Sequence, residues 1–113
     1  MPDCIFCKII AREIPSQPVY EDELTVAFRD ITPQAPKHIV IVPKKHIPRL
    51  SACKDEDNAL LGHLQRAAAA IAEKEGIAAG FRLVTNNGAS AGQSVDHLHY
   101  HLLGGRPMHW PPG

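Results

Sequence analysis

The feature that most constrains this chain is a segment in which histidine alternates with apolar residues: Val95-Asp96-His97-Leu98-His99-Tyr100-His101-Leu102-Leu103. On a β-strand successive side chains point to opposite faces, and residues two apart are separated by roughly 6.6 Å along the strand. The alternation therefore predicts a strand over residues 95–103. One face of this strand would join a core, and the other would carry three imidazoles.

Imidazole titrates near neutrality, and it can act as a base, an acid, a nucleophile or a metal ligand. Three imidazoles on one face displace the β-branched and aromatic side chains that usually pack there, and a purely structural strand has little reason to accept this exchange. A half-exposed strand that happens to carry histidines is therefore the weaker interpretation. The spacing alone does not distinguish a metal cage from a nucleophile with supporting histidines.

The rest of the chain predicts short elements joined by polar turns. Apolar residues at helical spacing predict a short helix over residues 4–13, before Pro15, and a long helix over residues 55–75, before Gly76. Further strands are predicted at residues 19–21, 24–29, 38–43 and 80–86. Short turns between strands favour an antiparallel sheet, so the pattern predicts an α+β fold with about five strands and its helices on one face.

Composition limits the classes of partner. The 113 residues fit a single domain, 1–113. Lys and Arg balance Asp and Glu at 12 each, so the chain has no bulk field to attract nucleic acid or an anionic membrane. The sequence contains no basic, apolar leader and no stretch of ~20 apolar residues. We therefore expect a cytoplasmic protein with no nucleic-acid or membrane partner, whose three cysteines are reduced.

The turn before the histidines offers groups that could hold a phosphate without net charge. Gly88 and Gly92 permit close backbone approach, Gln93 supplies an amide, and Ser94 supplies a hydroxyl. A loop of this composition is more often only a turn when it stands alone. Next to three histidines, we interpret it as a phosphate-binding loop.

Residues 92–106 resemble the signature of the histidine-triad (HIT) superfamily, in which three histidines alternate with apolar residues. The similarity extends over nearly the whole chain, through Ile5-Phe6, Ile14-Pro15, Phe28-Arg29-Asp30-Ile31, Pro36-Lys37-His38, Pro43-Lys44-Lys45-His46-Ile47, Leu60-Leu61-Gly62-His63-Leu64 and Met108-His109-Trp110-Pro111-Pro112-Gly113. It points to the Hint branch, the histidine-triad nucleotide-binding proteins. The resemblance implies a HIT-like fold whose sheets join across a homodimer, and it implies no organic cofactor.

The resemblance also implies a reaction, the hydrolysis of the P–N bond in purine nucleoside 5′-phosphoramidates such as AMP or GMP joined to an amine. His99 would attack the α-phosphorus and form a nucleotidyl-histidine that water resolves. His38 would orient His99 as its hydrogen-bond partner, and His101 would bind phosphate oxygens. Ser94 would supply the proton path to the leaving amine.

By the same resemblance, an apolar slot holds the base and polar groups hold the ribose and phosphate. The base slot would be formed by Ile5, Phe6, Ile9, Phe28 and Ile31; the phosphate would be reached by Asn86, Gly92, Gln93, Ser94, His99 and His101. Asp30 would accept the hydrogen bonds of the ribose hydroxyls, since one carboxylate can accept both. Trp110 would reach the site of the partner subunit. From the pattern alone, Phe28 and Ile31 would be ordinary core residues.

Cys4 and Cys7 form a motif that the triad chemistry does not need. Two thiolates at this spacing are half of a tetrahedral zinc site. Some bacterial HIT proteins complete such a site with residues that correspond to His46 and His97, so the resemblance implies structural Zn²⁺ on these four residues. The simpler alternative is two buried thiols on a short helix.

Two other functions are compatible with the sequence. In the first, His97, His99 and His101 together ligate one catalytic zinc of a metal-dependent hydrolase, because alternate histidines on a strand can do this. In the second, the chain is a non-catalytic nucleotide-binding scaffold, since binding residues and catalytic residues overlap.

Overall fold

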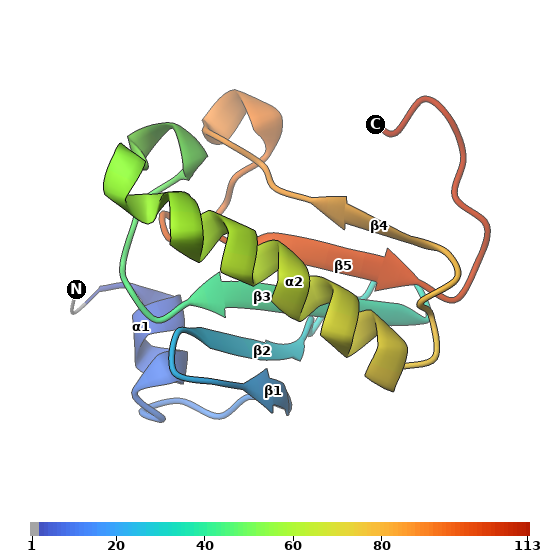
Figure 1. Ribbon diagram of the computed structural model, residues 1–113, viewed down its shortest axis with the longest axis horizontal. Coiled ribbons are helices and arrows are strands. Elements are labelled where there is room, and N and C mark those ends of the chain that lie inside the picture. The colour runs from blue at the N-terminus through green and yellow to red at the C-terminus, as the bar shows by residue number, and fades with distance from the viewer. Residues whose placement is uncertain (1–2) are drawn as a thin grey trace.

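The computed structural model describes residues 3–113, and its central feature is one antiparallel sheet crossed on one face by a long helix (Figure 1). The strands are β1 (Pro18–Glu21), β2 (Thr25–Arg29), β3 (Lys37–Pro43), β4 (Phe81–Val84) and β5 (Tyr100–Gly104). Their order in the sheet is β1-β2-β3-β5-β4, and each neighbouring pair is antiparallel. The predicted α+β fold with about five strands is confirmed. The expectation that the helices lie on one face is wrong, because a short helix at residues 5–10 packs on the opposite side of the sheet.

Strand β3 lies at the centre because its β-branched run can be buried on both faces. Ile39 and Ile41 pack into the core beneath the long helix, while Val40 and Val42 face the opposite side with Phe28. All four of these β3 side chains are almost completely buried. The period of two thus divides the molecule into a thick core on one face and a thin apolar layer on the other.

The long helix, α2 (Asn58–Lys74), covers the core face of the sheet (Figure 1). It begins later than predicted because residues 55–57 form a tight 3₁₀ turn, in which the Asp57 carboxylate accepts a hydrogen bond from the Lys54 backbone N–H. Leu64 and Ile71 are its large, fully buried residues. Among residues 3–113, no helix is both long and apolar enough to cross a membrane.

The short helix, α1 (Ile5–Ile10), packs on the opposite side of the sheet, where Phe6 joins the layer formed by Phe28 and Val40. It ends earlier than predicted, because Arg12 adopts a left-handed conformation with φ of 62°. Phe6 is the buried residue of this helix. Helix α1 therefore covers only part of the second face of the sheet.

The histidine segment differs from its prediction, because β5 begins at Tyr100 rather than at residue 95. The register pairs Tyr100 with Ile41, so continued pairing would place Leu98 opposite Pro43, which has no N–H for a ladder. Leu98 instead donates its N–H to the Ile47 carbonyl over 2.6 Å. The alternation of side chains survives, since Leu98, Tyr100 and Leu102 all enter the core.

Candidate functional site

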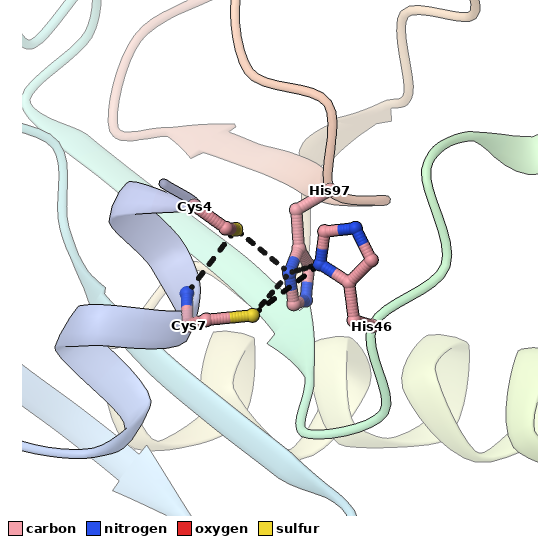
Figure 2. A group of neighbouring side chains, drawn as sticks. All are labelled: Cys4, Cys7, His46 and His97. Atoms are coloured by element: carbon pink, nitrogen blue, oxygen red, sulfur yellow. Dashed lines mark hydrogen bonds between the residues drawn. The ribbon is translucent and has the colours of Figure 1, made fainter. Parts of the chain in front are cut away.

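Four predicted metal ligands meet between α1 and the segments that follow β3 and precede β5 (Figure 2). Cys4 caps α1 and Cys7 lies one turn later, so both thiols lie on the same side of the helix. The Cys4 Sγ lies 3.3 Å from His97 Nδ1, and the Cys7 Sγ lies 3.3 Å from His46 Nδ1 and 3.6 Å from His97 Nδ1. The two Nδ1 atoms are 3.1 Å apart.

These separations fit a tetrahedral ion. With Zn–S bonds of about 2.3 Å and Zn–N bonds of about 2.05 Å, a tetrahedron has S–N edges of about 3.6 Å and N–N edges of about 3.3 Å. The far nitrogen of His97, Nε2, lies 2.8 Å from the Pro43 carbonyl, and a carbonyl can only accept. That bond fixes the proton on Nε2 and leaves Nδ1 free for a metal. The residues present therefore fit Zn²⁺.

The surroundings of Cys7, His46 and His97 favour the neutral forms of these three groups. Burial raises the pKa of the Cys7 thiol, and the adjacent Cys4 thiol raises it further. Burial also lowers the pKa of His46 and that of His97. A bound dication would reverse the preference of the thiols, because a coordinating thiol is deprotonated.

The middle histidine, His99, lies against a different set of partners. Its ring packs edge-on against Phe6, with centroids 5.0 Å apart, and it is 4% exposed. Its Nδ1 lies 2.7 Å from the His97 carbonyl, which can only accept, so Nδ1 carries the proton. The lone pair of His99 is therefore on Nε2, the nitrogen that a nucleophile or base would use.

The third histidine, His101, is paired with His38, whose Nε2 lies 2.9 Å from His101 Nδ1. The Gln34 backbone N–H donates to His38 Nδ1 over 3.0 Å, so the proton of His38 is on Nε2 and is donated to His101. His101 must then carry its own proton on Nε2. This chain of bonds presents His101 as a hydrogen-bond donor.

Burial and the nearby Asp30 carboxylate act in opposite directions on the pKa values of His38 and His101. Burial lowers the pKa of His101 to about 4, helped by His99 and His38, although the Asp30 carboxylate opposes the shift. Burial likewise lowers the pKa of His38 against the opposing effect of Asp30. The Asp30 Oδ2 lies 3.4 Å from His38 Nε2 and 3.8 Å from His101 Nδ1. Both rings are consequently neutral at pH 7.

The predicted bond between His38 and His99 is wrong. The register pairs Val40 with His101, and His38 lies on the same face of β3 as Val40, so its ring reaches His101 diagonally. His99 lies beyond the end of the β3–β5 ladder and bonds to the His97 carbonyl instead. His38 therefore acts on His101, not on His99.

The alternative with one catalytic zinc on the three triad histidines is also wrong. His97 Nδ1 faces the thiols, His99 Nδ1 faces a carbonyl, and His101 Nδ1 faces His38. Asp30, His38 and His101 do converge. However, a metal on His38 Nε2 would need the ring proton on Nδ1, where it would oppose the Gln34 N–H.

A cavity of about 270 Å³ opens beside His99 and His101. The predicted residues that line it are Ile5, Phe6, Ile9, Phe28, Asp30, Ile31, Ser94, His99 and His101. Phe28 is buried, as the pattern alone indicates, but Ile31 is 98% exposed at the rim. The Asp30 Oδ1 accepts from the Thr32 N–H over 2.8 Å, which fixes the carboxylate.

Gln93 does not reach this cavity, so its predicted contact with a phosphate is wrong for the side chain. Its amide nitrogen donates to the carbonyls of Pro48 and Val95, over 2.8 and 2.9 Å, and its Oε1 accepts from the Gly88 N–H over 2.8 Å. Gly92 has φ of 91°, and a Cβ there would lie 4.0 Å from the Asn86 amide nitrogen. Asn86, Gly92 and Trp110 are not among the lining residues of the cavity.

The bonds that fix the tautomers come from backbone groups that residue types do not reveal. They are the carbonyls of Pro43 and His97 and the N–H of Gln34. Any residue type could provide such a carbonyl. The sequence carries one signal for these bonds. Position 34 is not proline, so its backbone has an N–H to donate.

Comparisons with known proteins show the family of this chain. The model of the HIT domain family matches residues 11–108. An uncharacterized HIT-like protein of Synechocystis is 60% identical over 98% of this chain and 97% of its own length. A HIT family hydrolase from Legionella pneumophila, a crystal structure, has a TM-score of 0.96 and 50% identity, covering 98% of this chain and 100% of the other.

A more distant solved relative, the histidine triad nucleotide-binding protein of Candida albicans, has a TM-score of 0.82. It is 34% identical, and the match covers 96% of this chain and 83% of the other. The three histidines, the sheet that carries them and the extent of these matches lead to one conclusion. The chain belongs to the HIT family.

Proposed function

We propose that this HIT protein is a nucleotide-binding hydrolase that cleaves the P–N bond of purine nucleoside 5′-phosphoramidates. The observation that carries the proposal is the tautomer of His99, whose Nδ1–H is held by the His97 carbonyl over 2.7 Å while the ring lines the cavity. The bond places the ring proton on Nδ1 and leaves the lone pair on Nε2 as the nucleophile. The names of the Legionella hydrolase and the Candida nucleotide-binding protein support the same class of activity.

The proposed reaction has two displacements at phosphorus. The Nε2 lone pair of His99 attacks the α-phosphorus, the P–N bond breaks, and the amine leaves with a proton that solvent water supplies through the Ser94 hydroxyl. The hydrolysis of the adduct later returns one proton to solvent. Water then attacks the phosphorus, the P–His99 bond breaks, and the nucleoside monophosphate is released. His101 Nε2–H donates to a phosphate oxygen in both transition states, where its preorganised position is most effective.

The lining of the cavity supports a nucleoside ligand. Phe6 and Phe28 pack with ring centroids 5.5 Å apart and form an apolar wall, next to the Asp30 carboxylate. Apolar walls suit a purine base, and a fixed carboxylate suits the two hydroxyls of a ribose. In this proposal the base lies against α1, the ribose at Asp30, and the phosphate at His99 and His101.

The test is hydrolysis of adenosine 5′-phosphoramidate by the wild type and by His99→Ala, each with and without chelator. We expect turnover that His99→Ala abolishes and that chelator lowers but does not abolish in protein that stays folded. A surface variant, His63→Ala, is the matched histidine control. Wild type that binds AMP without turnover would instead establish the non-catalytic scaffold.

We also propose that Cys4, Cys7, His46 and His97 hold a structural Zn²⁺. The fit of their separations to a tetrahedron supports this, and so does the second bond that orients His97. With four protein ligands the ion has no open position, so it supplies cross-linking between segments rather than chemistry. Purified protein dialysed without added metal should contain about one zinc per chain.

A homodimer is the assembly we propose. Strand β4 is an outer strand of the sheet and Phe81 on it is 38% exposed, so this edge can pair with a second copy. In this assembly Trp110, which is 83% exposed on a tail tied by Arg82 to the His109 carbonyl, would reach the site of the partner subunit. Sedimentation of the wild type and of Phe81→Asp tests the assembly.

A further inference from the structure

Helix α1 serves two sites at once. Cys4 and Cys7 belong to the metal cluster, whereas Ile5, Phe6 and Ile9 line the cavity beside His99. The helix has only six residues, which is too short to be stable on its own. The side-chain tie that follows it, between Arg12 and Glu21, is an exposed ion pair that contributes little. The metal cluster is thus a principal attachment of this wall, together with the packing of Phe6 on Phe28 and Val40.

The segment before β5 makes a second connection. His97 offers Nδ1 to the cluster, and its carbonyl accepts the Nδ1–H of His99 over 2.7 Å. The Phe6 ring packs edge-on against both imidazoles, with its centroid 6.0 Å from that of His97 and 5.0 Å from that of His99. A shift of His97 would therefore move both the nucleophile and the wall of the cavity.

The two sites also share part of a lining. A second cavity, of about 380 Å³, opens beside the cluster and is lined by Cys4 and His46. Ile5, Ser94 and Val95 line both this cavity and the one beside His99. These three residues therefore form the partition between the cavity beside the metal cluster and the nucleotide cavity.

From this shared framework we infer that metal and nucleotide binding are thermodynamically linked. Resting on the proposed function, the inference is that Zn²⁺ on Cys4, Cys7, His46 and His97 raises nucleotide affinity by fixing α1 and His97. By linkage, nucleotide must raise zinc affinity by the same factor. The four ligands are then positioning residues for His99 as well as a structural clamp, and available zinc regulates the activity.

The experiment measures zinc affinity rather than turnover. A chromophoric chelator competes with the wild-type protein for zinc, with and without saturating AMP, and a protein-free titration corrects for complexes of AMP with zinc. We expect AMP to raise zinc affinity by about 5- to 150-fold, the usual range of coupling between two sites. The reciprocal measurement, AMP affinity of zinc-loaded and zinc-free protein, must give the same factor.

Asp30→Asn is the matched variant, because Asp30 lies in the nucleotide cavity and is not among the cluster residues. Without AMP, this variant should bind zinc with the wild-type affinity. Higher AMP concentrations should be needed to raise its zinc affinity. A second readout is hydrogen exchange in residues 5–10, which zinc and AMP should each slow. Equal zinc affinity with and without bound AMP overturns the linkage, even where turnover supports the proposed hydrolase. Failure to bind zinc overturns both the linkage and the zinc site.

Discussion

The first and second histidines of the triad are two residues apart, yet their surroundings differ completely. His97 has its proton on the buried side, toward the Pro43 carbonyl, and offers Nδ1 to two thiols. His99 has its proton on Nδ1, toward a backbone carbonyl, and offers Nε2 to an apolar cavity. The comparison shows that a repeated residue acquires its chemistry from the carbonyl that selects its tautomer.

The largest expected effect separates the two histidines by activity. His99→Ala removes the nucleophile, so kcat for adenosine 5′-phosphoramidate should fall by at least about 10³-fold, as for other covalent nucleophiles. Zinc content should stay that of the wild type. Mass spectrometry of the rapidly quenched wild type should detect a nucleotidyl adduct that the variant lacks. Turnover of His99→Ala at the wild-type rate would place the nucleophile elsewhere.

The next largest effect tests the stability that the metal cluster provides, since His97 belongs to this cluster and His99 does not. Removing zinc with a chelator should lower the free energy of unfolding by about 4 kcal/mol, relative to protein at a free zinc concentration a thousandfold above its Kd. Urea unfolding with and without chelator measures this. Cys53→Ala, the cysteine outside the cluster, should respond to chelator as the wild type does. An unchanged unfolding midpoint after metal removal would contradict the structural role of the cluster.

A smaller effect tests whether tautomer selection extends to the third histidine. His38→Ala removes the donor to His101 Nδ1, so His101 no longer has its proton fixed on Nε2, and kcat should fall by about 10- to 100-fold. Nitrogen NMR of the His101 ring reports the tautomer directly. His38→Gln offers an amide N–H near the lost nitrogen and should restore part of the activity. An unchanged His101 tautomer in His38→Ala would contradict this role.

The smallest expected effect concerns the Asp22 carboxyl, which binds His63 outside both sites and contributes to stability. Burial opposes the ionisation of Asp22, but hydrogen bonds from the Leu24 N–H, the Tyr20 hydroxyl and His63 lower its pKa from 3.8 to about 2. The carboxylate form is thus favoured by folding, and its contribution of at most about 2 kcal/mol is present above pH 4 and lost as the pH falls toward 2.

Urea unfolding between pH 5 and pH 2 tests this contribution. Asp22→Asn should remove part of the pH dependence of the wild type, while Glu23→Gln, at the neighbouring exposed acid, should leave it unchanged. Identical pH profiles for wild type and Asp22→Asn would contradict the pKa shift.

The sequence predicted what side-chain type determines and missed what backbone register determines. The β-branched run at residues 39–42 and the apolar stripe of α2 predicted the layers of the fold, because burial follows periodicity. The Cys4–Cys7 spacing and the resemblance of His46 and His97 indicated which four residues would meet. The start of β5 and the partner of His38 depended on the register between β3 and β5, which periodicity does not report.

Gln93 is a further instance. Its residue type suggested a ligand for phosphate, but the amide is occupied by three backbone groups, from Gly88, Pro48 and Val95. An amide has the same donors and acceptor whether it binds a ligand or a loop. Only the path of the loop decides between the two uses.

The amide of Gln93 also has a kinetic consequence. It connects the loop at Pro48, the turn at Gly88 and the segment before β5 at Val95. The turn that precedes the triad is therefore ordered when the chain folds, not when a ligand binds. Nucleotide association should then be a single step, with an observed rate that rises linearly with nucleotide concentration and reaches no plateau. In Gln93→Ala the same turn would have to order after encounter, and the rate would saturate.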